Sequence, residues 1–189
     1  MSADPTDPNE IPAGAFSEWL RGMQRALRGD QDSDVPCGDC RACCRSSQFI
    51  HIEPDETDTL AHIPRALRFP APGLPAGNVL LGYDEQGECP MLTEKGCSIY
   101  EHRPRACRMY DCRIFAATGI PIDDPAKAPV ARQVRRWRFA LATSHDRVAR
   151  DAVRTAAARL TDSASQLPPG TVRPSPVELA VRSIRAVSI

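Results

Sequence analysis

The stretch that decides the fold of this chain is Cys37-Gly38-Asp39-Cys40-Arg41-Ala42-Cys43-Cys44. It places four thiols within eight residues, and so short a loop keeps their sulfurs close together. Cysteines that serve only as small apolar residues are spread over a core, whereas clustered thiols are typical of a metal site. We therefore expect these four cysteines, Cys37, Cys40, Cys43 and Cys44, to be metal ligands.

The other half of the eight cysteines lies in a second region, which begins with Cys89-Pro90. Arginines accompany these cysteines, and nearby positive charge favours the thiolate form that binds metals. Four further metal ligands are predicted here: Cys89, Cys97, Cys107 and Cys112. The arginines concerned are Arg103, Arg105, Arg108 and Arg113.

Two arginines and one histidine are candidates for supporting roles. Arg103 and Arg108 are predicted to donate hydrogen bonds around the thiolates and to offset their charge, as side chains around metal ligands commonly do. His102 lies between Cys97 and Cys107, so it is the best candidate for a nitrogen ligand. The other histidines, His51, His62 and His145, have no comparable context.

Two kinds of metal centre fit this spacing. Structural zinc takes four tetrahedral ligands, usually from two Cys-x-x-Cys pairs. A 4Fe-4S cluster prefers a Cys-x-x-Cys-x-x-Cys loop and a remote fourth cysteine. Cys37, Cys40 and Cys43 have the triple spacing, and Cys89 before Pro90 resembles the remote ligand. The spacing favours iron–sulfur slightly, and zinc stays open.

The adjacent pair Cys43-Cys44 bears on the number of centres. Consecutive side chains usually diverge, so the two sulfurs are expected to point apart and to serve different sites. Eight thiols suffice for two four-coordinate centres, or for one cluster and one structural zinc.

Apolar periodicity predicts helices on both sides of the cysteine regions. A helix over 15–28 ends at Gly29, and its Trp19 is expected in the core. Helical structure is predicted from about 130 to 160, with Thr143-Ser144 able to start a second helix. Ser175-Pro176-Val177-Glu178 matches a capping box that opens a C-terminal helix.

Short extended segments are predicted between the two cysteine regions, at 49–52 and 79–81. The expected fold is therefore mainly α, with a small irregular cysteine-rich metal-binding core and a short β-hairpin. We divide the chain into an N-terminal tail and helix (1–36), a cysteine-cluster domain (37–113) and a helical C-terminal extension (114–189).

The chain opens with acidic residues and prolines instead of the basic and apolar run of a signal peptide. It also lacks an apolar stretch of about 20 residues that could span a bilayer. A cytoplasmic protein without a membrane contact is expected. Thiols stay reduced in that compartment, which is a further reason to interpret the cysteines as metal ligands.

Taken together, the cysteine motifs resemble the YkgJ-like cysteine-cluster family, a zinc- or iron-chelating domain with the signature CxxCxxCC. The resemblance covers roughly residues 37–113 and rests on a combination of motifs. It implies metal chelation by the cysteines. Some larger relatives are flagellin lysine methylases, but this shorter chain lacks room for their additional sequence. The motifs outside the CxxCxxCC run are Cys89-Pro90, Gly96-Cys97-Ser98-Ile99-Tyr100, Arg103-Pro104 and Cys107-Arg108.

Three functions compete. The first is a metal-binding protein that holds zinc or iron, with a protein as a conceivable partner. The second is a metal-dependent enzyme, although the sequence has no glycine-rich dinucleotide loop, P-loop or Ser/His/Asp arrangement. The third is a zinc-stabilised nucleic-acid-binding module that uses Arg132, Arg135, Arg136 and Arg138, arginines that are more often a solvated face. We expect the first.

Overall fold

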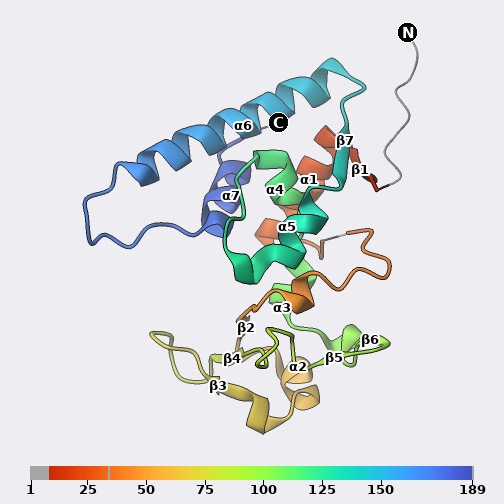
Figure 1. Cartoon of the computed structure of the whole chain (residues 1–189), viewed down its shortest axis with the longest axis vertical. Helices are drawn as coiled ribbons and strands as arrows, with labels where there is room; N and C mark the ends of the chain where they lie inside the picture. Colours follow the sequence, from red (N-terminus) through yellow and green to blue (C-terminus); the bar gives the residue numbers. More distant parts are fainter. Residues whose placement is uncertain (1–8, 34, 189) are drawn as a thin grey trace. The chain divides into compact units, whose positions relative to one another are not determined.

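The computed structural model describes residues 9–33 and 35–188 (Figure 1). Its helices, with 3-10 turns written η, are α1 (Phe16–Arg28), η1 (Cys43–Arg45), α2 (Thr57–His62), η2 (Arg65–Leu67), η3 (Tyr100–His102), α3 (Arg105–Met109), α4 (Arg113–Thr118), η4 (Pro125–Lys127), α5 (Ala128–Val134), α6 (Ser144–Ser165) and α7 (Pro176–Arg185). Its strands are β1 (Ile11–Ala15), β2 (Ile50–Ile52), β3 (Arg68–Pro70), β4 (Val79–Leu81), β5 (Leu92–Thr93), β6 (Gly96–Cys97) and β7 (Trp137–Ala140).

Helical residues outnumber strand residues, yet the strands form three small sheets. The protein is therefore a mixed α/β protein in which helices predominate, and the expectation of a mainly α fold holds only loosely. The chain also divides into two compact units. Among the described residues, unit 1 contains 9–31, 111–122 and 131–188, and unit 2 contains 32–33, 35–110 and 123–130.

Unit 1 is built around four helices, α1, α4, α6 and α7, and one pair of strands (Figure 1). Phe16, Leu20, Val153 and Ile184 are fully buried between these helices. Trp19 is 6% exposed, and the indole ring lies 4.8 Å from the ring of Phe139. The prediction that Trp19 belongs to the core is confirmed.

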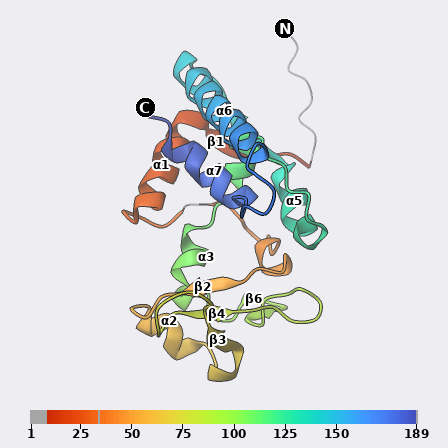
Figure 2. The same cartoon turned by 90° about the vertical axis from the view of Figure 1, so that its left-hand side faces the viewer.

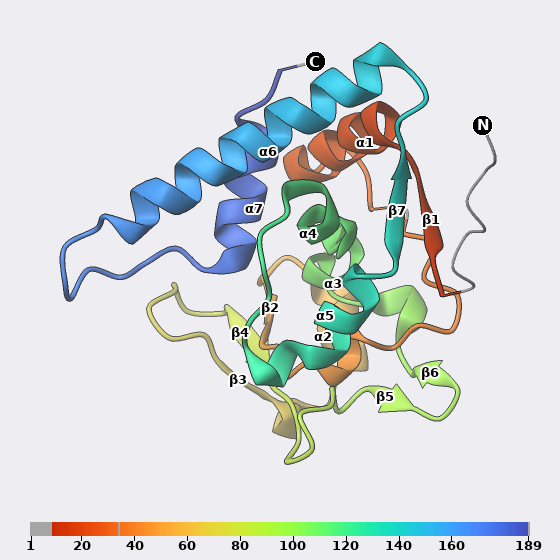
Figure 3. The same cartoon turned by 45° about the horizontal axis from the view of Figure 1, so that its top comes forward.

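The helical interpretation of residues 130–160 is wrong for residues 137–140. Trp137–Ala140 is the strand β7, which pairs in parallel with β1 (Figure 3). Helical periodicity misassigned this segment because its pairing partner lies more than a hundred residues earlier in the chain.

Helix ends follow the local chemistry that the sequence shows. Gly29 ends α1 in the left-handed conformation, at φ 82°. Reciprocal capping boxes open α6, with Thr143 and Asp146, and α7, with Ser175 and Glu178. The predicted caps of these helices are therefore confirmed.

Asp146 also connects α6 to α1, and this contact makes the stability of unit 1 depend on pH. One carboxylate oxygen of Asp146 accepts hydrogen bonds from the Ser17 hydroxyl (2.6 Å) and backbone N–H (3.0 Å). The other accepts from the Thr143 hydroxyl (2.7 Å) and backbone N–H (2.9 Å). The two hydroxyls, Ser17 first, and the two N–H groups hold the pKa of this carboxyl far below its usual range.

The Asp146→Asn variant should therefore unfold at a lower temperature than wild type at neutral pH. Because the folded pKa lies below the unfolded value of about 3.9, the charge stabilises the folded state above that pH. This stabilisation is lost as the pH falls from the unfolded pKa toward the folded pKa. The difference in unfolding temperature between wild type and Asp146→Asn should therefore narrow below about pH 4. Thermal unfolding followed by circular dichroism measures it.

The matched control is Asp151→Asn on the same helix, where Asp151 forms only an exposed ion pair with Arg150. Such surface pairs contribute little, so this variant should behave like wild type at every pH. A pH-independent defect in Asp146→Asn would show that the charge of Asp146 does not stabilise the fold.

Unit 2 is less regular and has a smaller core. The strand order in its larger sheet is β2-β4-β3, with antiparallel pairing throughout, and α2 follows β2 in the chain (Figure 2). The pairing of β2 with β4 confirms the two predicted extended segments. Its core consists of Ile52, Ile63, Leu81, Met91 and Ile99, and Cys89 and Cys97 pack against this core.

A further antiparallel pair, β5 and β6, in which Leu92 lies opposite Cys97, was not predicted from the sequence. None of the helices in the described part of the chain is both long and apolar enough to cross a membrane.

Candidate metal centre

The two cysteine regions meet through backbone hydrogen bonds in unit 2. The N–H of Cys89 donates to the carbonyl of Cys44 (2.7 Å), and the N–H of Ser47 donates to the carbonyl of Gly87 (2.9 Å). A β-carbon on Gly87 would lie 2.4 Å from the Ser47 hydroxyl oxygen, so this close approach requires glycine. The first cysteine run is thereby fixed beside the start of the second.

A buried serine and a lysine hold the turn that follows Cys44. The hydroxyl of Ser46, a fully buried residue, donates to the carbonyl of Ala42 (2.6 Å). The Lys127 ammonium, from η4, donates to the carbonyls of Ser46 (2.7 Å) and Ser47 (2.6 Å). Burial lowers the pKa of Lys127. Sequence analysis missed both residues, because a carbonyl-binding lysine distant in the chain leaves no local pattern.

The adjacent thiols do not diverge as expected. Cys43 and Cys44 begin the 3-10 turn η1, and their sulfurs lie 4.0 Å apart. The sequence argument assumed the usual divergence of neighbouring side chains, which a tight turn overrides here. The hydrogen bond from Cys44 lowers the pKa of Cys43 to about 7, and the same bond raises the pKa of Cys44 well above the usual thiol range.

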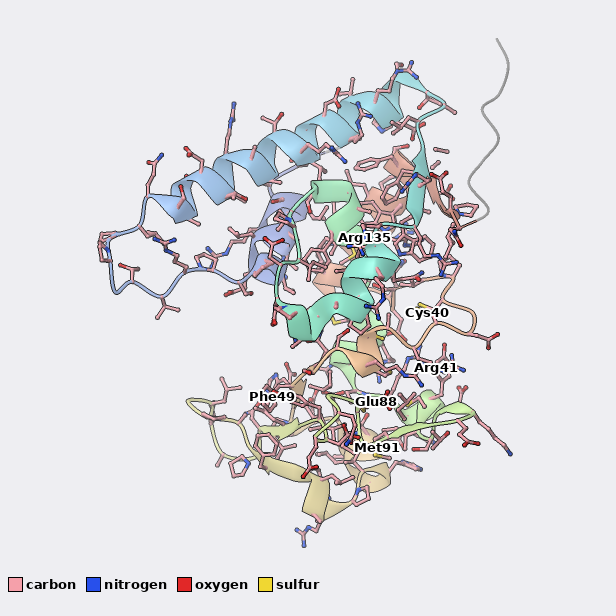
Figure 4. The ribbon with its side chains drawn as sticks, viewed as in Figure 1. Cys40, Arg41, Phe49, Glu88, Met91 and Arg135 are labelled. Carbon is pink, nitrogen blue, oxygen red and sulfur yellow. The ribbon has the colours of Figure 1, made fainter. Side chains whose placement is uncertain are left out.

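Cys97 reaches this region on the β5–β6 hairpin. The preceding Gly96 has φ 113°, a conformation that favours glycine. A β-carbon on Gly96 would lie 3.1 Å from a terminal nitrogen of Arg41, so the guanidinium of Arg41 packs directly against the glycine. Arg41 follows Cys40 on the first cysteine loop (Figure 4), and the contact links that loop to the hairpin.

Cys107 lies on α3, whose start is fastened by acidic residues. The carboxylate of Glu56, a buried residue, accepts hydrogen bonds from the backbone N–H groups of Glu53 and Arg105. The guanidinium of Arg105 pairs with Glu53 and Asp55. These contacts, rather than a thiol, occupy the polar groups of Arg105 and set the position of α3.

Five thiols of unit 2 influence one another electrostatically. Burial raises the pKa of Cys107 to about 12, and charges on Cys43, Cys89 and Cys97 raise it further. Burial also raises the pKa of Cys89, with contributions from Cys97 and Cys43. Cys44 is affected by Cys43, Cys89 and Cys107. These thiols, from three segments of the chain, are therefore close enough for like charges to be costly, which a bound cation would relieve.

The remaining predicted ligands have different surroundings. Cys37 is exposed and Cys40 half-buried, and the N–H of Cys40 donates to the carbonyl of Cys37 (2.8 Å). Cys112 belongs to unit 1, where it is buried and its sulfur accepts a hydrogen bond from the Trp137 indole N–H (3.2 Å). Their role as ligands stays a prediction.

Arg103 and Arg108, the two arginines with predicted supporting roles, have different contacts. Arg103 lies over the ring of Tyr100 (4.2 Å), and its positive charge opposes the rise in the pKa of Cys107. Arg108 pairs with Asp32 (3.3 Å) and donates to the carbonyl of Arg103 (2.6 Å). Neither contact tests their predicted role around the thiolates.

Arg113 has a structural partner in unit 1. Its guanidinium pairs with the buried carboxylate of Asp111 (2.8 Å), which also accepts a hydrogen bond from the Trp19 indole N–H (2.8 Å). Sequence proximity to Cys112 suggested a role at the thiols, but this network accounts for the buried side chain of Arg113.

His102, the predicted nitrogen ligand, lies at the end of η3 and faces α2. Its Nδ1 is 2.7 Å from a carboxylate oxygen of Asp58, and its ring stacks on that of His62. Sequence analysis gave His62 no role, because the residues around it do not show that its ring stacks on His102, which lies 40 residues later in the chain.

Unit 2 is thus a small, irregular, cysteine-rich unit that brings the two cysteine regions together, and its thiols have the donor chemistry that zinc and iron require. Residues 36–121 match the family model CxxCxxCC, described as a putative zinc- or iron-chelating domain. This match confirms the family that the cysteine motifs predicted for this part of the chain. Searches of the curated proteins and of the solved structures found no match.

Proposed function

We propose that this protein chelates zinc or iron through a thiolate centre in unit 2, built on Cys43, Cys44, Cys89, Cys97 and Cys107. The observation that carries the proposal is the meeting of the two cysteine regions, in which the Cys43 and Cys44 sulfurs lie 4.0 Å apart and the Cys89 N–H donates to the Cys44 carbonyl (2.7 Å). Burial and neighbouring thiols raise the pKa of Cys89 and Cys107, so a bound cation would favour their thiolate forms. A divalent ion or a cluster would stabilise the thiolates together.

Of the two metals, we propose iron in a 4Fe-4S cluster as the first form and zinc as the second. In this form Cys37 and Cys40 would join Cys43 as ligands, because the three have the triple spacing of cluster-binding loops, and Cys89 precedes a proline like the remote ligand. The Cys89–Cys44 hydrogen bond brings the two cysteine regions together for either metal, and Lys127 holds the turn that follows Cys44. When bound, the metal would supply structural stability, and a cluster would add electron transfer.

Anaerobically purified protein should contain iron and acid-labile sulfide, or else tightly held zinc. Elemental analysis with sulfide determination distinguishes the forms, and an iron–sulfur protein should be brown. The purification should be performed under reducing conditions, in keeping with the cytoplasmic location that we propose. Folded protein with eight free thiols and no metal after anaerobic purification would refute the proposal.

The basic residues after α5 give no support to the nucleic-acid alternative. Arg138 pairs with Glu10 (2.7 Å), and Arg136 donates to the carbonyl of Asn9 (2.9 Å). Both arginines thus fasten the segment around β1 within unit 1. We therefore do not propose nucleic-acid binding.

A further inference from the structure

Two histidines and an aspartate of unit 2 converge outside the cysteines. Asp58 and His62 lie on α2, and His102 ends η3. The Nδ1 atom of His102 is 2.7 Å from one carboxylate oxygen of Asp58, and Nδ1 of His62 is 3.7 Å from the other. One ligand atom from each of the three residues lies within 4.8 Å of the other two.

We propose that Asp58, His62 and His102 form a second metal site, on the surface of unit 2, for a divalent ion of intermediate softness such as Zn²⁺. Two imidazoles and one carboxylate are a ligand set that zinc and the neighbouring transition ions accept. Three protein ligands leave at least one coordination position for water or another ligand. The site is thus an open one that contains no sulfur.

The backbone that carries the three ligands is already in place. The buried carboxylate of Glu56, directly before α2, binds the N–H groups of Glu53 and Arg105 and so connects α2 to α3. His102 is separated from α3 by two residues, and its N–H donates to the carbonyl of Ile99 (2.9 Å). Binding would therefore require side-chain rotation and not a rearrangement of the chain.

Binding of an ion requires a change in the orientation of the imidazole rings. The two imidazole rings stack with their centroids 3.6 Å apart and their planes 4° from parallel. Parallel rings direct their nitrogen lone pairs in separate planes, so at least one ring must tilt before both nitrogens reach one ion at about 2.0–2.1 Å. Both histidine side chains are about 40% exposed, so solvent does not block a tilt, and a ring that tilts gives up one hydrogen bond to Asp58: that of His62 Nδ1 with the backbone carbonyl (2.9 Å) or that of His102 Nδ1 with the carboxylate (2.7 Å).

The charged side chains around Asp58 affect whether its carboxylate can bind a metal ion. Asp58 interacts favourably with His102, His62 and Arg108, and these interactions lower its pKa, the hydrogen bond from His102 most of all. Asp58 therefore stays ionised and available as a ligand. Arg108 has partners of its own in Asp32 and the Arg103 carbonyl, so its guanidinium need not move when an ion binds.

The test uses the full chain, first saturated with Zn²⁺ and freed of excess by gel filtration. Further Zn²⁺ is then titrated while calorimetry measures binding and heteronuclear NMR observes the histidine side chains. Wild type should bind about one further equivalent, with shifts of the His62 and His102 imidazole resonances. His62→Gln and His102→Gln should each weaken this binding at least about tenfold.

The matched control is His145→Gln, which removes an exposed histidine of unit 1 and should bind the further equivalent like wild type. Asp58→Asn provides an independent variant if a histidine substitution reduces folding, which circular dichroism monitors. The inference is overturned if the His62 and His102 resonances do not respond to Zn²⁺. It is also overturned if the further equivalent persists in His62→Gln, His102→Gln and Asp58→Asn alike.

The outcome is independent of the thiolate centre. Failure of the proposed thiolate function would appear as absence of zinc after gel filtration, whereas failure of the second site would appear only in the later titration. In the histidine variants the zinc retained through gel filtration should equal that of wild type.

Discussion

Replacing Cys89 or Cys107 with serine should lower metal retention at least about tenfold. Both cysteines belong to the five thiols that influence one another, and they reach the centre on different segments. A serine hydroxyl keeps nearly the same size but does not ionise near neutral pH, so it cannot replace a thiolate ligand. The metal-to-protein ratio after anaerobic purification and gel filtration measures the effect.

A suitable control in the same hairpin region is Ser98→Ala. The Ser98 hydroxyl bonds to the Met91 carbonyl (3.1 Å), which also accepts the Ser98 N–H (2.8 Å). Loss of the hydroxyl should therefore leave the metal content unchanged. If Cys89→Ser and Cys107→Ser retain the metal of wild type, the five-thiol centre is wrong.

The same measurement on Cys37→Ser, Cys40→Ser and Cys112→Ser decides how many centres exist. If all eight cysteines serve, as the spacing predicts, each of these variants should also lose metal. If there is one centre, at least three of the eight cysteines should be replaceable with little loss. Normal metal in both Cys37→Ser and Cys40→Ser would contradict the interpretation of the triple spacing.

Removal of the metal should loosen unit 2 far more than unit 1. The core of unit 2 contains five buried apolar residues, and much of the unit is turns and two- or three-residue strands. The core of unit 1 contains three times as many buried apolar residues, which lie around helices α1, α4, α6 and α7. A small core leaves a domain dependent on its metal, because metal binding is then coupled to folding.

Hydrogen exchange of the metal-loaded and metal-free proteins, followed by mass spectrometry, tests this difference. Protection should fall in peptides that cover η1, the β5–β6 hairpin and α3. Peptides from α1 and α6 serve as internal controls and should exchange at the same rate in both forms. Equal protection of unit 2 in the two forms would show that the metal has no structural role.

Local features of the chain were predictable where the cause is itself local. Gly29, the Ser175-Glu178 capping box and the apolar stripe that contains Trp19 act within a turn or two of helix, so their effect can be deduced from neighbouring residues. The same holds for the short strands at 50–52, where apolar and polar residues alternate, and at 79–81, which is a short apolar run.

Prediction failed where a distant partner decides. Trp137–Ala140 becomes a strand because β1 lies beside it, and α-helical periodicity cannot reveal such a partner. Arg105 and Arg113 were expected near thiols because they are close to them in sequence, yet each is engaged by carboxylates. The ion pairs of these arginines depend on which carboxylates the fold places beside them, and distance along the chain does not show this.

By itself the sequence determined the family and the donor chemistry, because grouped thiols retain their affinity for zinc and iron in any fold that keeps them together. Only the tertiary structure decided which groups converge. It placed Cys43 and Cys44 side by side on one 3-10 turn, fastened Cys89 to Cys44, and stacked His62 on His102. Convergence depends on chain reversals and on contacts between residues far apart in the sequence, and spacing along the chain carries no information about either.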